Sequence, residues 1–401
     1  MKAGLGLVLG LLATLGQCGA GAQEVHTNPL NRDPLVKEAF QHFYDLDYPG
    51  AIERFERFHE MHAGDPQATA LLLDAKIFQA LYQQDRLDTT FYANDGFLTG
   101  RHATEEDPKV RDGIFALADE AVHEADWRIQ KNPNDVDALY ARGWVRALKC
   151  AYIAMVERSF AAGFRLANKA REDEEKVLRL DPQYVDAKLI TGVYQYVVGA
   201  LPLPFKFLIG FAGISGSKKM GMAMLNDVAT RGVASSAEAR TVIALFLRRE
   251  SKYPQAIEVV KSLEAQYPHD YLFALEEANL RKDAGEGMVA VDTYRRIVAN
   301  SEKTGYYASA RLELLYFGLG DALRGQRHYA EAAESYERAG KTSEAGAELR
   351  IRSLLGAGQC RDLNGERDPA KRDYQMAIDA GPSTSRADAA RKYLKTPFTG
   401  H

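Results

Sequence analysis

Two stretches near the end of the 401-residue chain decide the fold: GDALRGQRHYAEAAESYERA at residues 320–339 and GQCRDLNGERDPAKRDYQMA at residues 358–377. Both carry small and aromatic residues at corresponding positions. These are Gly320, Leu323, Tyr329, Ala332, Tyr336 and Ala339 in the first, and Gly358, Gly365, Ala370, Tyr374, Ala377 and the following Pro382 in the second. Small residues let two helices approach closely, and aromatic side chains fill the space around them. Each stretch therefore predicts one helix–turn–helix unit.

The same pattern extends toward the N-terminus. Ala256 and Ala290 keep the spacing in two further units. In the N-terminal half, three second helices end in a proline turn, which stops a helix: GDP at 64–66, KNP at 131–133 and LDP at 180–182. We count about eight units, starting near residues 32, 68, 136, 185, 237, 271, 313 and 351. The predicted fold is an all-α, right-handed superhelical solenoid, closed by a polar capping helix and tail at 385–401.

These offsets resemble the tetratricopeptide repeat superfamily, whose unit is a helix pair of about 34 residues. The resemblance covers nearly all of the chain after residue 34. An apolar segment of the form LPxxFKxLxGFxG, followed by SKKMGMAML, is similar to the TPR39-like family, of bacterial secreted type. The resemblance implies a scaffold that binds a protein or peptide, without an enzymatic activity of its own.

Composition agrees with a folded helical protein. Hydrophobic residues make up 46% and charged residues 26% of the chain, and alternating strand-like runs are scarce. The net charge of −4 gives no reason to expect a nucleic-acid partner. The sequence leaves the oligomeric state open.

The N-terminus predicts export. Residues 1–22 read as a signal peptide with Lys2, an apolar core and an A-x-A cleavage site, which predicts a periplasmic or secreted protein. Cys18 offers a less favoured alternative, a lipoprotein anchor.

Residues 23–34 are expected to form a flexible polar leader. Cys150 and Cys360 are expected to be small buried residues, not a disulfide.

The chain divides into irregular repeats at 35–236 and regular repeats at 237–384. The irregular units carry extra residues at the turn between their first and second helices, at 85–108, 150–168 and 199–216. All such turns lie on one edge of a stacked array, so this edge is a candidate interaction surface. The most apolar insertion holds three aromatic residues that are candidates for hydrophobic contact: Phe205, Phe207 and Phe211. Burial of this insertion and a peripheral membrane contact through residues 201–214 both stay open.

Signs of chemistry are weak. His59 and His62 lie three residues apart on one helix, without a third ligand placed by the sequence. The acidic segment 95–107 also holds His102, which gives a second alternative, a metal-dependent enzyme. Both patterns are also ordinary for solvated helix ends. We therefore expect no enzyme activity, no metal and no cofactor.

The concave face is the main predicted site. Polar residues of the first helices line this face in repeat arrays of this kind, and counting the positions in the regular units gives Arg248, Asn279, Lys282, Asp321, Arg324, Arg352 and Gln359. The lining is net basic and carries amides. It predicts a protein or peptide partner with an acidic segment or a free C-terminus, bound by charge-assisted hydrogen bonds in the cell envelope. Charges on a solvated surface with no ligand are the plain alternative.

Overall fold

The computed structural model describes residues 25–93, 107–201, 215–343 and 345–400. In these residues the chain forms eight antiparallel helix pairs and one last helix. The pairs are α1 (Pro34–Tyr44) with α2 (Tyr48–Met61), α3 (Pro66–Gln83) with α5 (Pro108–Lys131), α6 (Val136–Tyr152) with α7 (Phe160–Leu180), α8 (Lys188–Ala200) with α10 (Lys218–Arg231), α11 (Ser236–Arg249) with α12 (Tyr253–Gln266), α13 (Tyr271–Asp283) with α14 (Gly287–Ser301), α15 (Leu312–Gly325) with α16 (Tyr329–Lys341), and α17 (Ala347–Leu363) with α18 (Arg367–Ala380). Helix α19 (Ser385–Lys395) follows.

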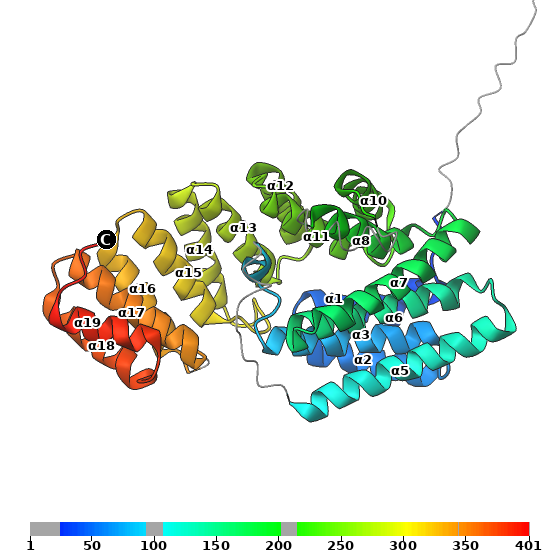
Figure 1. The fold of residues 1–401 in the computed structure, drawn as a ribbon, viewed down its shortest axis with the longest axis horizontal. Coiled ribbons are helices and arrows are strands. Elements are labelled where there is room, and N and C mark those ends of the chain that lie inside the picture. Colours follow the sequence, from blue (N-terminus) through cyan, green and yellow to red (C-terminus); the bar gives the residue numbers. More distant parts are fainter. Residues whose placement is uncertain (1–24, 94–106, 202–214, 344, 401) are drawn as a thin grey trace, which may run out of the picture.

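Each helix packs mainly on its neighbours in the chain, as a solenoid requires. Figure 1 shows the pairs stacked from the N-terminal half (blue to green) to the C-terminal half (yellow to red). The predicted all-α array of about eight units is thus confirmed.

Aspartate and proline fix several helix starts. Asp65 accepts the N–H of Gln67 at 2.9 Å, and Asp107 accepts that of Lys109 at 2.9 Å. Proline follows each aspartate and occupies the first helical turn, where no N–H is needed. The proline turn at 64–66 is therefore the start of the next helix as well as a stop, whereas the helices after the turns at 131–133 and 180–182 begin at Val136 and Val185.

The small–aromatic pairs of the sequence form the contacts inside the regular units. Gly320 faces the ring of Tyr336, and Gly358 faces the ring of Tyr374. A Cβ added at these glycines would lie 2.7 Å and 2.6 Å from the rings. Both tyrosines are buried, so the ring occupies the space that the missing side chain leaves. The small–aromatic packing expected within these two units is thus confirmed.

Gly358→Ala is expected to lower the free energy of unfolding by about 1–3 kcal/mol, because the new methyl group overlaps the buried ring of Tyr374. Gly113→Ala is the matched control, since Gly113 lies at an exposed position in α5 with nothing near its Cβ position. The control should stabilise the helix by up to about 1 kcal/mol. Urea denaturation measures both, and an equal effect of the two substitutions would refute this packing argument.

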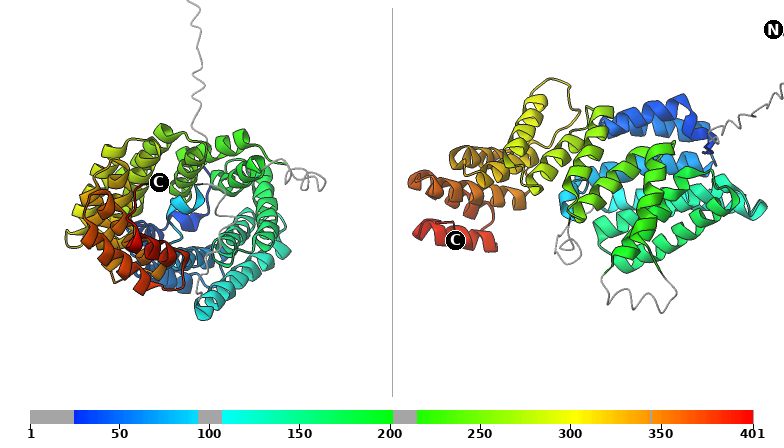
Figure 2. Two further views of the ribbon diagram at one scale, coloured as in Figure 1. Left: turned by 60° about the vertical axis from the view of Figure 1, so that its left-hand side comes forward. Right: turned by 90° about the horizontal axis from the view of Figure 1, so that it is seen from above.

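The superhelix closes on itself. Viewed toward its left-hand end, the array forms a ring of helices (Figure 2, left). Tyr44 of α1 stacks on Tyr267 after α12, with ring centroids 4.3 Å apart, and its hydroxyl donates to Glu238 of α11 at 2.5 Å. One hydrophobic cluster joins residues of α1–α3 with residues of α13–α17. We call the contact of α1, α3 and residues 84–93 with α11–α15 the closure seam.

Residues 25–33 of the leader lie against the turn between α7 and α8. The His26 N–H donates to the carbonyl of Gln183 at 3.1 Å, and the Thr27 hydroxyl donates to buried Asp186 at 3.2 Å. Asn31 donates to Thr27 at 2.9 Å. These polar side chains pair with the turn between α7 and α8.

Candidate functional site

Arg248, the first predicted groove residue, is buried inside the closure seam. Only 4% of it is exposed. Its guanidinium donates to Glu276 of α13 at 3.0 Å, to Asp283 at 2.7 and 2.9 Å, and to the Thr89 hydroxyl at 3.0 Å. Thr89 belongs to the segment after α3, so the chain itself occupies this part of the concave face.

Asn279 is buried too, and it accepts a hydrogen bond from the Tyr294 hydroxyl at 2.5 Å. These two residues hold the structure together and are not open to a partner. The expectation of an open lining is therefore wrong at both positions. The physical reason is closure of the superhelix, which covers this part of the face.

The other predicted residues are partly or fully exposed. Lys282 approaches Asp321 at 3.9 Å, and Asp321 accepts the Tyr336 hydroxyl at 2.5 Å. Arg324 of α15 donates to Gln359 of α17 at 2.9 Å. Exposed Arg352 lies over the ring of Phe317, 4.5 Å from its centroid. The structure thus brings these residues together on α13, α15 and α17 as a basic and aromatic surface.

The chain's own C-terminal tail lies on this surface. The ring of Phe398 packs against Tyr393, with centroids 5.2 Å apart, and the Arg324 guanidinium lies 5.6 Å from its centroid. The Phe398 N–H donates to Asp362 at 2.7 Å. Figure 1 shows the tail running back from α19 toward the preceding helices. An aromatic residue in a peptide segment is thus held by one cation and one carboxylate.

Two side chains hold the Asp362 carboxylate that accepts this N–H. Its side chain is fully buried, accepts the Tyr374 hydroxyl at 2.8 Å and pairs with Arg367 at 2.9 Å. Sequence reasoning missed Asp362 and Phe398. The available signal was an aromatic residue placed directly after a polar capping helix.

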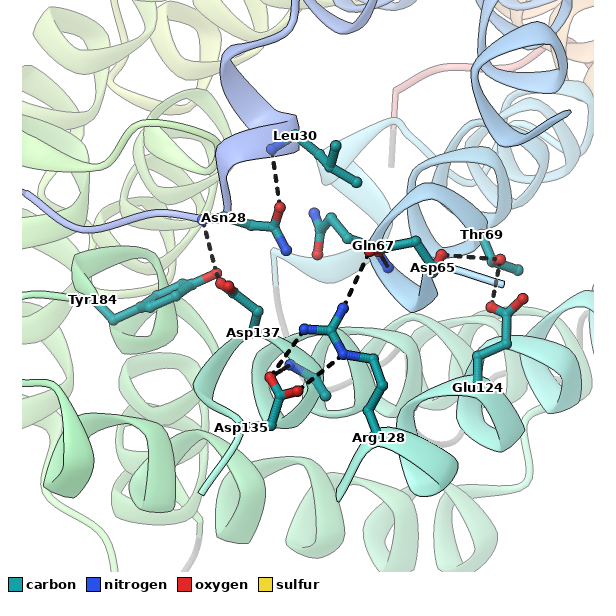
Figure 3. Close-up of polar contacts among 11 residues, drawn as sticks. Asn28, Leu30, Asp65, Gln67, Thr69, Glu124, Arg128, Asp135, Asp137 and Tyr184 are labelled. Atoms are coloured by element: carbon teal, nitrogen blue, oxygen red, sulfur yellow. Dashed lines mark hydrogen bonds and ion pairs between the residues drawn. The ribbon is translucent and has the colours of Figure 1, made fainter. Parts of the chain in front are cut away.

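A polar framework ties the helix starts of the N-terminal half (Figure 3). Arg128 of α5 donates to both oxygens of Asp135 at 2.9 and 3.1 Å and to Asp65 at 3.1 Å. Asp65 and Asp135 cap α3 and α6. The Tyr184 hydroxyl donates to Asp137 at 3.2 Å and accepts the Asn28 N–H at 3.0 Å, so the leader joins the same framework. These charges are paired with one another.

One cluster has the composition of a metal site. His59 of α2 and the glutamates Glu120 and Glu124 of α5 each place one ligand atom within 4.8 Å of the others. Thr69 donates to Glu124 at 2.6 Å, and Glu120 is half exposed. Burial raises the pKa of Glu124. His62 does not join the cluster and packs on the ring of Phe58, with centroids 4.4 Å apart. Imidazole and carboxylates suit Zn²⁺, and we assign the cluster no role.

The other candidates divide between described and undescribed residues. Asp107 caps α5, and Ser217 caps α10 by accepting the Met220 N–H at 3.2 Å. Cys360 is buried, Cys150 is half-buried, and both are free thiols. Phe205, Phe207, Phe211, Cys18, the signal peptide and most of the 95–107 segment lie outside the described residues. In the part that the structure describes, no helix has the length and apolar character to span a bilayer.

No family model matches the chain, and no curated protein matches it. Several solved structures match the chain. A tetratricopeptide repeat protein from Parabacteroides merdae is 15% identical with a TM-score of 0.33, over 80% of this chain and 97% of that one. Yeast Tom70 is 13% identical with a TM-score of 0.35, over 90% and 88% of the two chains. The P58(IPK) TPR domain is 12% identical with a TM-score of 0.23, over 90% and 97%.

The packing of the helix pairs defines the class. The chain is an α-helical solenoid of helix–turn–helix units, closed by contact between its first units and its middle units.

Proposed function

We propose that this protein is a binding scaffold that holds a peptide segment of a partner protein on the surface formed by α13, α15 and α17. The observation that carries the proposal is the C-terminal tail, which places Phe398 against Arg324 and donates its N–H to Asp362. A guanidinium beside an aromatic ring contributes about 0.5–2 kcal/mol. The partner segment would supply an aromatic residue and compete with the tail.

The remaining surface favours acidic groups beside that aromatic residue. Exposed Arg352 and partly exposed Lys282 lie on the neighbouring helices. Both can pair with carboxylates of a bound segment through charge-assisted hydrogen bonds. Binding by shape and charge needs no chemical step, so the scaffold acts without catalysis.

The test uses a labelled peptide with the tail sequence KTPFTGH. The full chain carrying Phe398→Ala should release its own tail and bind this peptide at least tenfold more tightly than the wild type, because a tethered competitor reaches an effective concentration in the millimolar range. Fluorescence anisotropy measures the affinities. Thermal unfolding of both chains checks that the substitution leaves the fold intact.

Two controls decide the outcome. A peptide with alanine in place of its phenylalanine should bind at least fivefold more weakly, and Arg324→Glu in the Phe398→Ala chain should weaken binding by a similar factor. Equal binding of both peptides would show that the surface does not recognise an aromatic segment and would remove the support for the proposal.

We further propose that the scaffold works in the cell envelope after export. The support is the sequence of residues 1–22, with its A-x-A site. N-terminal sequencing of the protein from the periplasmic or extracellular fraction should begin at Gln23. A mature protein that starts at a lipid-modified Cys18, or that stays in the cytoplasm with Met1 intact, would contradict this localisation.

A further inference from the structure

A cavity of about 190 Å³ lies within the closure seam. Helices α1 and α3 supply one side, and α11, α12 and α13 supply the other. Aromatic rings form much of the wall: Phe43, Tyr44, Tyr48, Phe78 and Phe273. The residues that line the cavity differ from those that hold the tail, Arg324 of α15 and Asp362 of α17.

Three carboxyl groups line this apolar cavity. Glu238 comes from α11, Asp270 caps α13, and Glu276 lies six residues further along α13. Most of the other lining residues are hydrophobic. Buried carboxylates in such surroundings are unfavourable unless a donor or a cation pairs with them.

Each glutamate lacks a donor for one oxygen. The Tyr44 hydroxyl donates to one oxygen of Glu238, and Arg248 and Thr89 donate to one oxygen of Glu276. Glu238 Oε2 and Glu276 Oε1 are buried and have no hydrogen-bond partner among the described residues. A buried acceptor without a donor costs about 1–3 kcal/mol. Both glutamates line the cavity, so a ligand held there lies beside two carboxyl groups that each lack one donor.

The charges around the cavity are unbalanced. Arg248 pairs with Glu276, whereas no ion pair to Lys or Arg is formed by Glu238 or Asp270 in the part of the chain that the structure describes. Buried Asp74 of α3 lies near Glu238 and adds to the surplus of carboxyl groups. Burial raises the pKa of Glu238 to about 7 and that of Asp270 to about 8. Burial thus favours the protonated form of these groups, and a cation brought in by a ligand would favour the carboxylate form.

We propose that the closure-seam cavity binds a small apolar amine, with the ammonium group at Glu238 and the apolar body among the aromatic side chains of α1, α3 and α13. An ammonium group carries three donors and no acceptor, so it suits orphaned carboxylate oxygens. An aromatic wall also attracts the cation. The volume limits the ligand to about the size of benzene with a short substituent, since an engineered cavity of about 150 Å³ holds benzene.

The test compares benzylamine with toluene on the full chain by isothermal titration calorimetry near neutral pH. The two probes share their ring and differ in the ammonium group. Benzylamine should bind at least tenfold more tightly than toluene. Equal affinities, or no binding of benzylamine, would overturn the proposal.

Two variants locate the site. Glu238→Gln keeps an oxygen for the Tyr44 hydroxyl and removes the charge, so it should weaken benzylamine at least fivefold and leave toluene unchanged. Glu258→Gln is the matched control, because Glu258 lies on α12 with 78% of its side chain exposed. Benzylamine binding that is unchanged by Glu238→Gln, or that is weakened equally by both variants, would place the ligand elsewhere and refute the assignment.

Discussion

Arg248→Ala is expected to lower the free energy of unfolding by about 3–5 kcal/mol, because it leaves the carboxylate of Glu276 buried without its cation. The guanidinium joins three parts of the closure seam: α11, α13 and residue Thr89 after α3. Its loss removes hydrogen bonds to Glu276, Asp283 and Thr89 together. The seam should then open before the rest of the array unfolds.

Urea denaturation followed by far-ultraviolet circular dichroism measures the loss. Arg240→Ala is the control on the same helix, because Arg240 is partly exposed and bonds to Ser262 and Gln266 at the surface. The control should lower the free energy of unfolding by less than about 1 kcal/mol. A loss from Arg248→Ala no larger than that of the control would contradict a buried, structural role.

A double substitution separates the effect of the unpaired charge on Glu276 from the loss of the other hydrogen bonds of Arg248. Arg248→Met with Glu276→Met replaces the buried pair by apolar side chains of similar size, and this should recover much of the stability lost in Arg248→Ala. If the double variant is as unstable as Arg248→Ala, the contribution of Arg248 comes from its bonds to Asp283 and Thr89 instead of the charge pair.

The helix pairs could be predicted because their signals are local. Units expected to start near residues 237, 271 and 313 begin with α11 at Ser236, α13 at Tyr271 and α15 at Leu312. The last two units each contain their own small residue and its aromatic partner. Gly320 meets Tyr336 across a separation of 16 residues, within the reach of a single repeat.

The closure seam could not be predicted in this way. Tyr44 and Glu238 are 194 residues apart, and Thr89 and Glu276 are 187 residues apart. Such contacts depend on the curvature summed over several repeats, which a repeat pattern does not specify. Counting positions correctly placed Arg248 on a first helix, but the count holds no information about which segment covers that helix.

The same limit applies to the candidate site. Lys282, Arg324 and Arg352 could be named because they lie at counted positions on the first helices of regular units. Glu238 and Asp270 gave no signal, since a carboxylate near a helix start is ordinary at the surface. Their burial arises only when α1 and α3 cover them.

These buried carboxyl groups predict that the protein loses stability as pH rises. Burial raises the pKa of Asp270 to about 8, and the pKa values of Glu238 and Glu276 to about 7, although Leu272, Tyr44 and Arg248 respectively act in the opposite direction. In the unfolded chain such groups titrate near pH 4. The folded state therefore holds protons that the unfolded state releases between about pH 4 and pH 8.

Because the unfolded state binds fewer protons in this range, the free energy of unfolding must fall with increasing pH. Each unit of pKa difference is equivalent to about 1.4 kcal/mol, so we expect a fall of about 2 kcal/mol or more between pH 5 and pH 8. Asp270→Asn with Glu238→Gln should flatten this slope. Asparagine still accepts the Leu272 N–H at the start of α13, and glutamine still accepts the Tyr44 hydroxyl, so the double variant removes the titration and keeps both bonds.

Urea denaturation at a series of pH values measures the slope, with Glu258→Gln as the control for the loss of one exposed carboxylate. A wild-type slope that stays unchanged in the double variant would show that other groups carry the pH dependence. A slope that flattens would show that closing the superhelix buries carboxyl groups in their protonated form. The seam would then be held most strongly at acidic pH, while an amine bound at Glu238 would shift that balance toward the charged carboxylate and keep the seam closed at higher pH.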